Sequence, residues 1–169
     1  MALLPILQAP HPILKTRAEP VAAIDDDLRR LVADMLETMY KAPGIGLAAP
    51  QVGVLKRLVV VDVAEGEERR PMALVNPEIL WRSDTLATAE EGCLSLPGQF
   101  ADVTRPEAIR LRYATEHGEE REIEADGLLA RCIQHEIDHL DGILFVDHLS
   151  ALRRNMIMRK LAKRRQQRA

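Results

Sequence analysis

Apolar and polar positions follow two different periods along this chain. Over residues 28–39 the apolar side chains recur three or four positions apart, on one face of a predicted helix: Leu28, Leu31, Val32, Met35, Leu36 and Met39. Asp25 to Asp27 supply an N-cap and acids that favour the start of this helix, and Pro43 and Gly44 end it. Residues 1–24 contain four prolines, so we expect an extended arm that lies over the body.

The middle of the chain has the features of strands. Residues 57–63 form a β-branched run that predicts a buried strand, whereas residues 44–51 are small and indicate a loop. A polar turn at Glu65 to Arg70 leads to short predicted strands near 72–75, 79–81 and 86–89. Alternation at 108–113 and 121–124, on either side of His117 and Gly118, predicts a two-stranded hairpin.

Two more helices are expected in the last third of the chain. One runs from about Asp126 to Leu140 and stops at Gly142, and a strand-like return follows it. The last begins at about Ser150, and its apolar positions are Leu152, Met156 and Leu161. This order predicts an α+β fold, with short antiparallel strands packed around a central helix and further helices at each end. We expect one domain, 1–169, in which 150–169 is a basic C-terminal helix.

Composition narrows the setting in which the protein works. No apolar run approaches the roughly 20 residues that cross a bilayer, and Met1 to Leu7 lacks the basic region of a signal peptide. The chain has two cysteines, Cys93 and Cys132, and without an export signal we expect no structural disulfide between them. A cytoplasmic protein without membrane contact is therefore predicted.

Charge is distributed unevenly. The net charge is −3, but residues 150–169 hold eight Lys or Arg and no acid, which leaves 15 basic against 26 acidic residues in 1–149. Such a basic tail on an acidic body indicates an anionic partner, and a merely solvated helix end explains the charge equally well.

The candidate metal-binding and acid–base residues lie in one segment, Gln134-His135-Glu136-Ile137-Asp138-His139. Residues four apart on a helix project from the same face, so His135 and His139 are placed to share one metal ion. Glu136 is rotated by about 100° from His135, beside the metal, where a base takes a proton from a bound water. The segment therefore predicts the metal site of a hydrolase.

A catalytic site of this kind needs a third protein ligand and an open position. The candidates are Cys93, Cys132, Asp138, His117 and His148. Cys132 and His139 are about 10.5 Å apart along the helix axis, too far to share an ion, so Cys132 is interpreted as a small residue packing beside the site. Asp138 points away from the ligand face, His117 belongs to a turn and His148 to the surface. Spacing modestly favours Cys93, because Gly92 before it permits close approach of the backbone.

Three segments together resemble the signature motifs of peptide deformylase, in order and in spacing. They are Gly44-Ile45-Gly46-Leu47-Ala48-Ala49-Pro50-Gln51, Glu91-Gly92-Cys93-Leu94-Ser95 and Gln134 to Leu140. The resemblance covers nearly the whole chain, and the basic C-terminal helix is similar to that of the Gram-negative bacterial type.

The resemblance implies a role for each matching position. Cys93, His135 and His139 would hold one divalent metal, natively Fe²⁺, although Zn²⁺, Ni²⁺ and Co²⁺ suit the same ligands. Glu136 would be the general base and acid, and Gln51 with the Leu94 N–H would bind the oxyanion. The loop around Gly44–Gly46 would pair with the substrate backbone. The pocket for a methionine side chain would be formed by Ile45, Gly46, Leu128 and Cys132.

The implied function is removal of the N-formyl group from the formyl-methionine of newly synthesised polypeptides, with release of formate. One alternative is a peptidase that cuts internal bonds, because it shares the H-E-x-x-H pattern; its third ligand usually lies downstream, whereas Cys93 lies upstream. The other is a ribosome- or RNA-associated binding module, with its function in the basic helix. We treat ribosome docking by that helix as an added hypothesis, and we expect a monomer.

Two residues depart from the family pattern. Arg131 stands where an apolar residue is common, and we expect its side chain to extend into solvent in preference to the pocket rim. Phe100 stands where many relatives carry a basic residue, so contacts at the mouth of the site are open.

Overall fold

The computed structural model describes residues 2–64 and 68–168, with side chains described as far as residue 166. Met1, part of the polar turn predicted at Glu65 to Arg70, and the side chain of Arg168 lie outside the described residues. The helices within the described ranges are α1 (Asp26–Lys41), α2 (Gly127–Leu140) and α3 (Ala151–Arg168), with short 3₁₀ turns η1 (Pro12–Lys15), η2 (Ala49–Val52) and η3 (Phe145–His148). The strands are β1 (Gly46–Ala48), β2 (Leu58–Val61), β3 (Met72–Arg82), β4 (Leu86–Cys93), β5 (Leu96–Pro106), β6 (Ala108–Ala114) and β7 (Glu120–Asp126).

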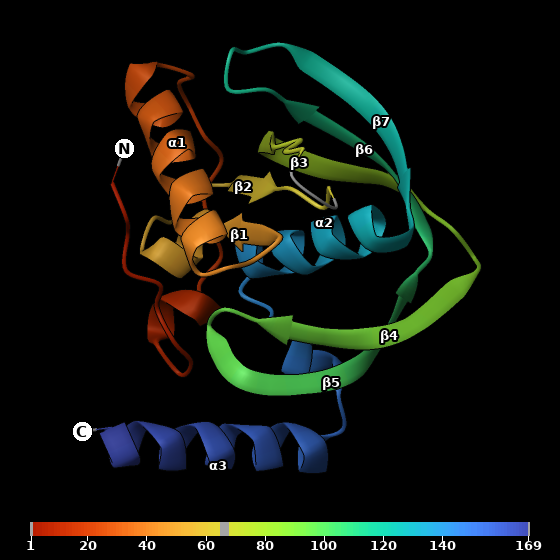
Figure 1. The fold of residues 1–169 in the computed structure, drawn as a ribbon. Coiled ribbons are helices and arrows are strands. Elements are labelled where there is room, and N and C mark those ends of the chain that lie inside the picture. Colours follow the sequence, from red (N-terminus) through yellow and green to blue (C-terminus); the bar gives the residue numbers. More distant parts are fainter. Residues whose placement is uncertain (1, 65–67, 169) are drawn as a thin grey trace.

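The strands within the described ranges form two antiparallel groups. A five-stranded sheet has the order β1-β2-β3-β6-β7, and β4 pairs with β5 in a separate ribbon. Figure 1 shows α2 running between the sheet and the β4–β5 ribbon, with α1 beside β1 and β2, and α3 along the outer side of β5. The predicted α+β architecture around a central helix is confirmed.

Local sequence explains the best-predicted elements. Asp25 caps α1, because its side chain accepts a hydrogen bond from the Leu28 N–H at 2.9 Å. The buried face of α1 contains the predicted Met35 and Met39, and it packs on β1 and β2. The arm before α1 is largely irregular and buries Leu14, as expected of a segment that lies over the body.

Several predicted elements differ from the structure. The two short strands near 72–75 and 79–81 are one strand, β3, because register shifts against β6 absorb the break in alternation around Pro77. No strand was predicted over β5, because its Pro97 and Gly98 are typical of a turn. The 44–51 loop contains β1 and η2, and the strand-like return after α2 is η3.

The apolar face of α3 was also partly mispredicted. Leu161 is buried as expected, but Leu152 is 68% exposed and Met156 is 47% exposed, and the second buried contact comes from Ile157. Basic residues interrupt the helical period on every side of α3, so its packing face could not be identified from the sequence.

Two apolar clusters lie next to α2 and the predicted metal-binding residues. Its Ile133, Ile137 and Leu140 join one apolar cluster with residues of β2, β3 and β6. A separate cluster beneath the β4–β5 ribbon contains Phe145 and Leu161, with Cys93 packed against it. Cys93 and Cys132 are free thiols, as predicted. Among the described residues, no helix combines the length and hydropathy needed to cross a membrane.

Candidate metal centre

The two histidines of α2 meet a cysteine from the ribbon. Cys93 ends β4, and it offers a sulfur atom within 4.8 Å of one ring nitrogen from each of His135 and His139. The Sγ atom of Cys93 lies 3.3 Å from Nε2 of His139. Ligand atoms around a tetrahedral ion with bonds of about 2.1 Å to nitrogen and 2.3 Å to sulfur lie roughly 3.5 Å apart. One thiolate and two imidazoles at these separations fit a divalent cation.

The other candidates for the third ligand are placed elsewhere. Cys132 is buried and its Sγ contacts the carbonyl oxygen of Ile45 at 3.5 Å. Asp138 accepts hydrogen bonds from Arg105 at 2.9 Å and from His148 at 2.7 Å, if His148 carries its proton on Nε2. His117 lies in the turn between β6 and β7.

A buried carboxylate fixes one of the histidines. Glu91 Oε1 lies 2.9 Å from Nδ1 of His135, and Arg105 binds both oxygens of Glu91 at 2.6 and 2.9 Å. Burial disfavours the charge, but the hydrogen bonds from Arg105 and His135 outweigh it and hold the pKa of Glu91 well below its usual range. A proton shared with Glu91 occupies Nδ1 of His135, so Nε2 is left to bind a cation.

The protein charges around the cluster favour a cation. Burial opposes charge on His135, but its hydrogen bonds to Cys93 and Glu91 outweigh burial and raise the pKa of the imidazole. A positive charge is thus stabilised here, and a metal ion supplies it as well as a proton does. At His139 burial and the positive charge of His135 lower the pKa, which keeps this ring in the neutral form that ligates metals.

Glu136 lies beside the cluster without being one of its members. Its Oε1 is 3.8 Å from Nε2 of His135, and no described residue hydrogen-bonds to its buried Oε2. Burial raises the pKa of this carboxyl to about 7, against the opposing effect of His135 and Arg105. A carboxyl group with such a pKa both accepts and releases a proton near neutral pH.

A cavity of about 680 Å³ opens onto these groups. The predicted pocket residues all line it, and so do the predicted acid–base and oxyanion residues: Ile45, Gly46, Leu128, Cys132, Gln51, Leu94 and Glu136. At Gly46 a Cβ atom would lie 2.8 Å from Cys132 Sγ and 2.9 Å from Glu136 Cγ. Only glycine therefore lets β1 approach α2 so closely.

Two hydrogen-bond donors converge beside Cys93. Gln51 is buried, and its Oε1 accepts a hydrogen bond from the Ala48 N–H at 2.9 Å, which fixes the amide. Its Nε2 then donates to Ser95 Oγ at 3.1 Å and lies 3.6 Å from Cys93 Sγ. No described residue accepts a hydrogen bond from the backbone N–H of Leu94.

The expected exposure of Arg131 is wrong. Only 11% of its side chain is exposed, and it lines the cavity. Its Nη1 donates to Glu91 Oε2 at 2.5 Å and to the Val103 carbonyl at 2.9 Å, while Nη2 donates to the Ala87 carbonyl at 2.7 Å. The β4–β5 ribbon crosses α2 at this point. The carbonyl oxygens of Ala87 and Val103 and the carboxylate of Glu91 therefore accept the hydrogen bonds that solvent was expected to accept.

Phe100 and Arg105 complete the surroundings. Phe100 is 61% exposed at the cavity mouth, and a Cβ at Gly92 would lie 2.5 Å from its ring. No role was predicted from sequence for Arg105, which links Glu91 to Asp138. It lies on the unpredicted strand β5, and nothing in its local sequence distinguishes it from a surface arginine.

Comparison with known proteins identifies the family. The family model described as polypeptide deformylase matches residues 3–155. A peptide deformylase of Phenylobacterium zucineum (strain HLK1) is 57% identical over 164 residues, covering 96% of this chain and 97% of that protein. One from Alkalilimnicola ehrlichii (strain ATCC BAA-1101 / DSM 17681 / MLHE-1) is 60% identical, with coverages of 96% and 91%.

Solved structures agree. A crystal structure of a peptide deformylase from Legionella pneumophila has a TM-score of 0.93 and 45% identity, covering 99% of this chain and 98% of that one. That of the Ehrlichia chaffeensis peptide deformylase in complex with actinonin has a TM-score of 0.93 and 43% identity, covering 97% and 98%. The chain belongs to the peptide deformylase family, metal-dependent hydrolases that remove the formyl group from N-formyl-methionine in nascent peptides.

Proposed function

We propose that Cys93, His135 and His139 hold one divalent cation, Fe²⁺ in its native form, with Zn²⁺, Ni²⁺ and Co²⁺ as possible substitutes. The donor set and the separations of its atoms support this assignment. Such a cation supplies a Lewis acid that polarises a carbonyl group and makes water acidic enough to attack near neutral pH.

Glu136 is the proposed general base and then general acid. Its unpartnered Oε2 is free to take the proton of the attacking water, and the raised pKa lets the same carboxyl deliver that proton to the leaving amine. Proton transfer by a positioned carboxyl typically contributes on the order of 10²- to 10⁴-fold to the rate.

Gln51 and Leu94 are the proposed oxyanion partners. The Gln51 amide is locked by Ala48, so its Nε2 faces the cluster without a cost of reordering during the reaction. The Leu94 N–H is the second donor. Loss of one such donor typically costs about 2.7–4 kcal/mol of transition-state stabilisation.

The cavity accounts for the substrate. Ile45, Leu128 and Cys132 give it an apolar wall of the kind that a methionine side chain requires, and Gly46 leaves room for the chain beside it. β1 is an edge strand of the sheet, so its outer side is available for pairing with an extended peptide backbone.

The observation that carries this function is the buried, unpartnered Glu136 carboxylate beside a cysteine and two histidines on the cavity wall. The protein should release formate from formyl-Met peptides and leave unblocked peptides of the same sequence intact. Cleavage of internal bonds without formate would instead support the metallopeptidase alternative.

We also propose that the basic helix α3 docks on ribosomal RNA, so that the enzyme meets nascent chains in the cytoplasm as a monomer. Arg153, Arg159, Lys160 and Lys163 are exposed on α3, and all residues of the site come from one chain. Co-sedimentation with ribosomes should fall as salt rises. If the protein did not co-sediment with ribosomes even at low salt, this part of the proposal would be refuted.

A further inference from the structure

The ligands of the proposed metal centre come from two elements, and their spacing depends on how these elements are held together. Cys93 ends β4, whereas His135 and His139 lie on α2. The backbone of α2 packs more closely on β1, β2 and β7 than on either strand of the ribbon. Side chains that attach the ribbon to α2 therefore control the distance between the cysteine and the two histidines.

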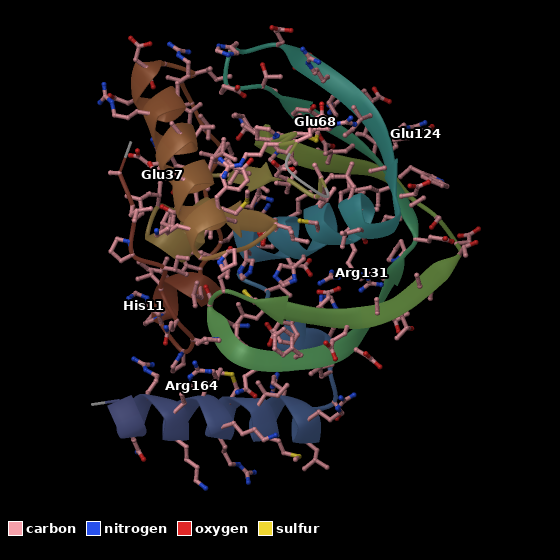
Figure 2. The ribbon with its side chains drawn as sticks, in the orientation of Figure 1. His11, Glu37, Glu68, Glu124, Arg131 and Arg164 are labelled. Atoms are coloured by element: carbon pink, nitrogen blue, oxygen red, sulfur yellow. The ribbon has the colours of Figure 1, made fainter. Side chains whose placement is uncertain are left out.

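Arg131 reaches from α2 to both strands of the ribbon. Its guanidinium donates to the Ala87 carbonyl on β4 at 2.7 Å and to the Val103 carbonyl on β5 at 2.9 Å. It also donates to the carboxylate of Glu91, two residues before Cys93, at 2.5 Å. Figure 2 shows Arg131 between α2 and the ribbon. Only 11% of its side chain is exposed, so these three acceptors hold the guanidinium.

A second arginine makes the same connection from the ribbon side. Arg105 on β5 binds both oxygens of Glu91 and donates to Asp138 on α2 at 2.9 Å. Glu91 is thus held by two guanidinium groups, and its Oε1 atom lies 2.9 Å from Nδ1 of His135. Because one residue separates Glu91 from Cys93, an anchor on this carboxylate also restricts the cysteine.

The charges of this network balance, since Glu91 and Asp138 are paired with Arg105 and Arg131. Charge alone gives Arg131 an unfavourable effect on a nearby metal ion, because like charges repel. Its contacts with the ribbon give it a favourable effect, because ligands that are already in place lose little conformational freedom when the ion binds. The two effects have opposite signs, so a measurement of metal affinity distinguishes them.

We propose that Arg131 is a positioning residue of the metal centre. It acts through Glu91 and through the ribbon backbone, which together hold Cys93 beside the two histidines and keep the Glu91 carboxylate on His135. This role rests on the proposed function, in which the cysteine and the histidines bind one divalent cation. Residues that orient metal ligands typically contribute about 10- to 100-fold to affinity, and Arg131 acts one contact further away, so we expect about tenfold.

The test measures metal affinity by competition with a chelator, with Ni²⁺ as the probe. Arg131→Met keeps a long side chain and removes all three hydrogen bonds to the ribbon. This variant should weaken Ni²⁺ binding about tenfold. Unchanged or tighter binding would overturn the inference, because the contacts with the ribbon would then contribute nothing, or less than the charge does.

Arg131→Lys keeps a positive charge next to Glu91, so it also serves if the methionine variant does not fold. An ammonium group lacks the planar fork that reaches acceptors on two strands. This variant should therefore weaken Ni²⁺ binding as well, by a smaller factor. Full affinity in the lysine variant would show that the contacts with both strands are not needed, and would contradict the inference.

Arg57→Met is the matched control. Arg57 is similarly buried, with 14% of its side chain exposed, and it too binds two carbonyl groups and one carboxylate: those of Ala18, Leu140 and Asp141. None of these partners belongs to the ribbon. Both methionine variants should lower the midpoint of urea unfolding of the metal-free protein, but only Arg131→Met should weaken Ni²⁺ binding. Equal losses of affinity would show a general effect of stability and contradict the inference.

The unaltered protein separates this role from the proposed function. If it failed to bind one Ni²⁺ ion per chain, the proposed metal centre itself would be refuted. If it bound one ion and the Arg131 variants bound it equally well, only the role of Arg131 would be refuted.

Discussion

The helices α2 and α3 are both rich in charged or polar side chains, but they differ in what those side chains contact. In α2 the buried residues include Gln134, His135, Glu136 and His139, and the first three are adjacent in sequence. Among the described residues of α3, the buried side chains are the apolar Ile157 and Leu161, while most of the basic residues are exposed. Burying polar groups costs free energy unless they have hydrogen-bond partners. The buried polar residues of α2 are therefore explained by their place in the site.

The contrast separates two kinds of functional inference. The charges around α2 are held by specific partners, as in the chain of contacts from His135 through Glu91 and Arg105 to Asp138. Changing one of them should therefore alter chemistry or metal affinity by large factors. The exposed cations Arg153, Arg159, Lys160 and Lys163 of α3 face solvent, where single charge contacts are weak and screened by salt.

The largest expected effect is at Glu136. Glu136→Ala should lower kcat by roughly a thousandfold, because it removes the proton carrier, and it should leave the ligands in place. Metal content per chain, measured beside formate release, distinguishes these outcomes. If metal content fell in step with activity, Glu136 would hold the site together instead of moving protons.

A smaller effect is expected one contact away from the cluster. Glu91→Gln should weaken metal affinity by roughly 10- to 100-fold, because His135 loses the carboxylate that orients its ring. Competition with a chelator measures that affinity. Glu90→Gln is the matched control, since Glu90 is the adjacent exposed acid on β4. Equal affinity for the two variants would show that Glu91 does not position His135.

The smallest effect on chemistry is expected on α3. Ile157 and Leu161 pack into the cluster that also holds Cys93, so deleting the helix would disturb the site and confuse the result. Replacing Arg153, Arg159, Lys160 and Lys163 with serine keeps that packing. This variant should lose ribosome binding, with a shallower salt dependence by about one unit per lost phosphate contact, and retain turnover of short peptides. Retained ribosome binding with an unaltered salt dependence would show that α3 is a solvated helix end.

The residues that could be predicted from the sequence are those whose arrangement depends on a single element. His135, Glu136 and His139 were assigned by helical spacing, a local property that requires only that this segment is a helix. Spacing favoured Cys93 only modestly as their partner, and the full ligand set was implied by the resemblance, because the set spans two elements far apart in sequence. Arg131 was placed wrongly, since its partners lie on β4 and on the unpredicted β5. Side chains whose partners come from tertiary structure cannot be positioned by periodicity.

The most direct test is a titration of metal-free protein with Fe²⁺ under anaerobic conditions, with formate release from a formyl-Met peptide as the readout. If Cys93, His135 and His139 form a single site, the rate should rise from near zero and reach a plateau at about one equivalent per chain. Turnover at full rate before any metal is added, or a plateau at two equivalents, would contradict this assignment.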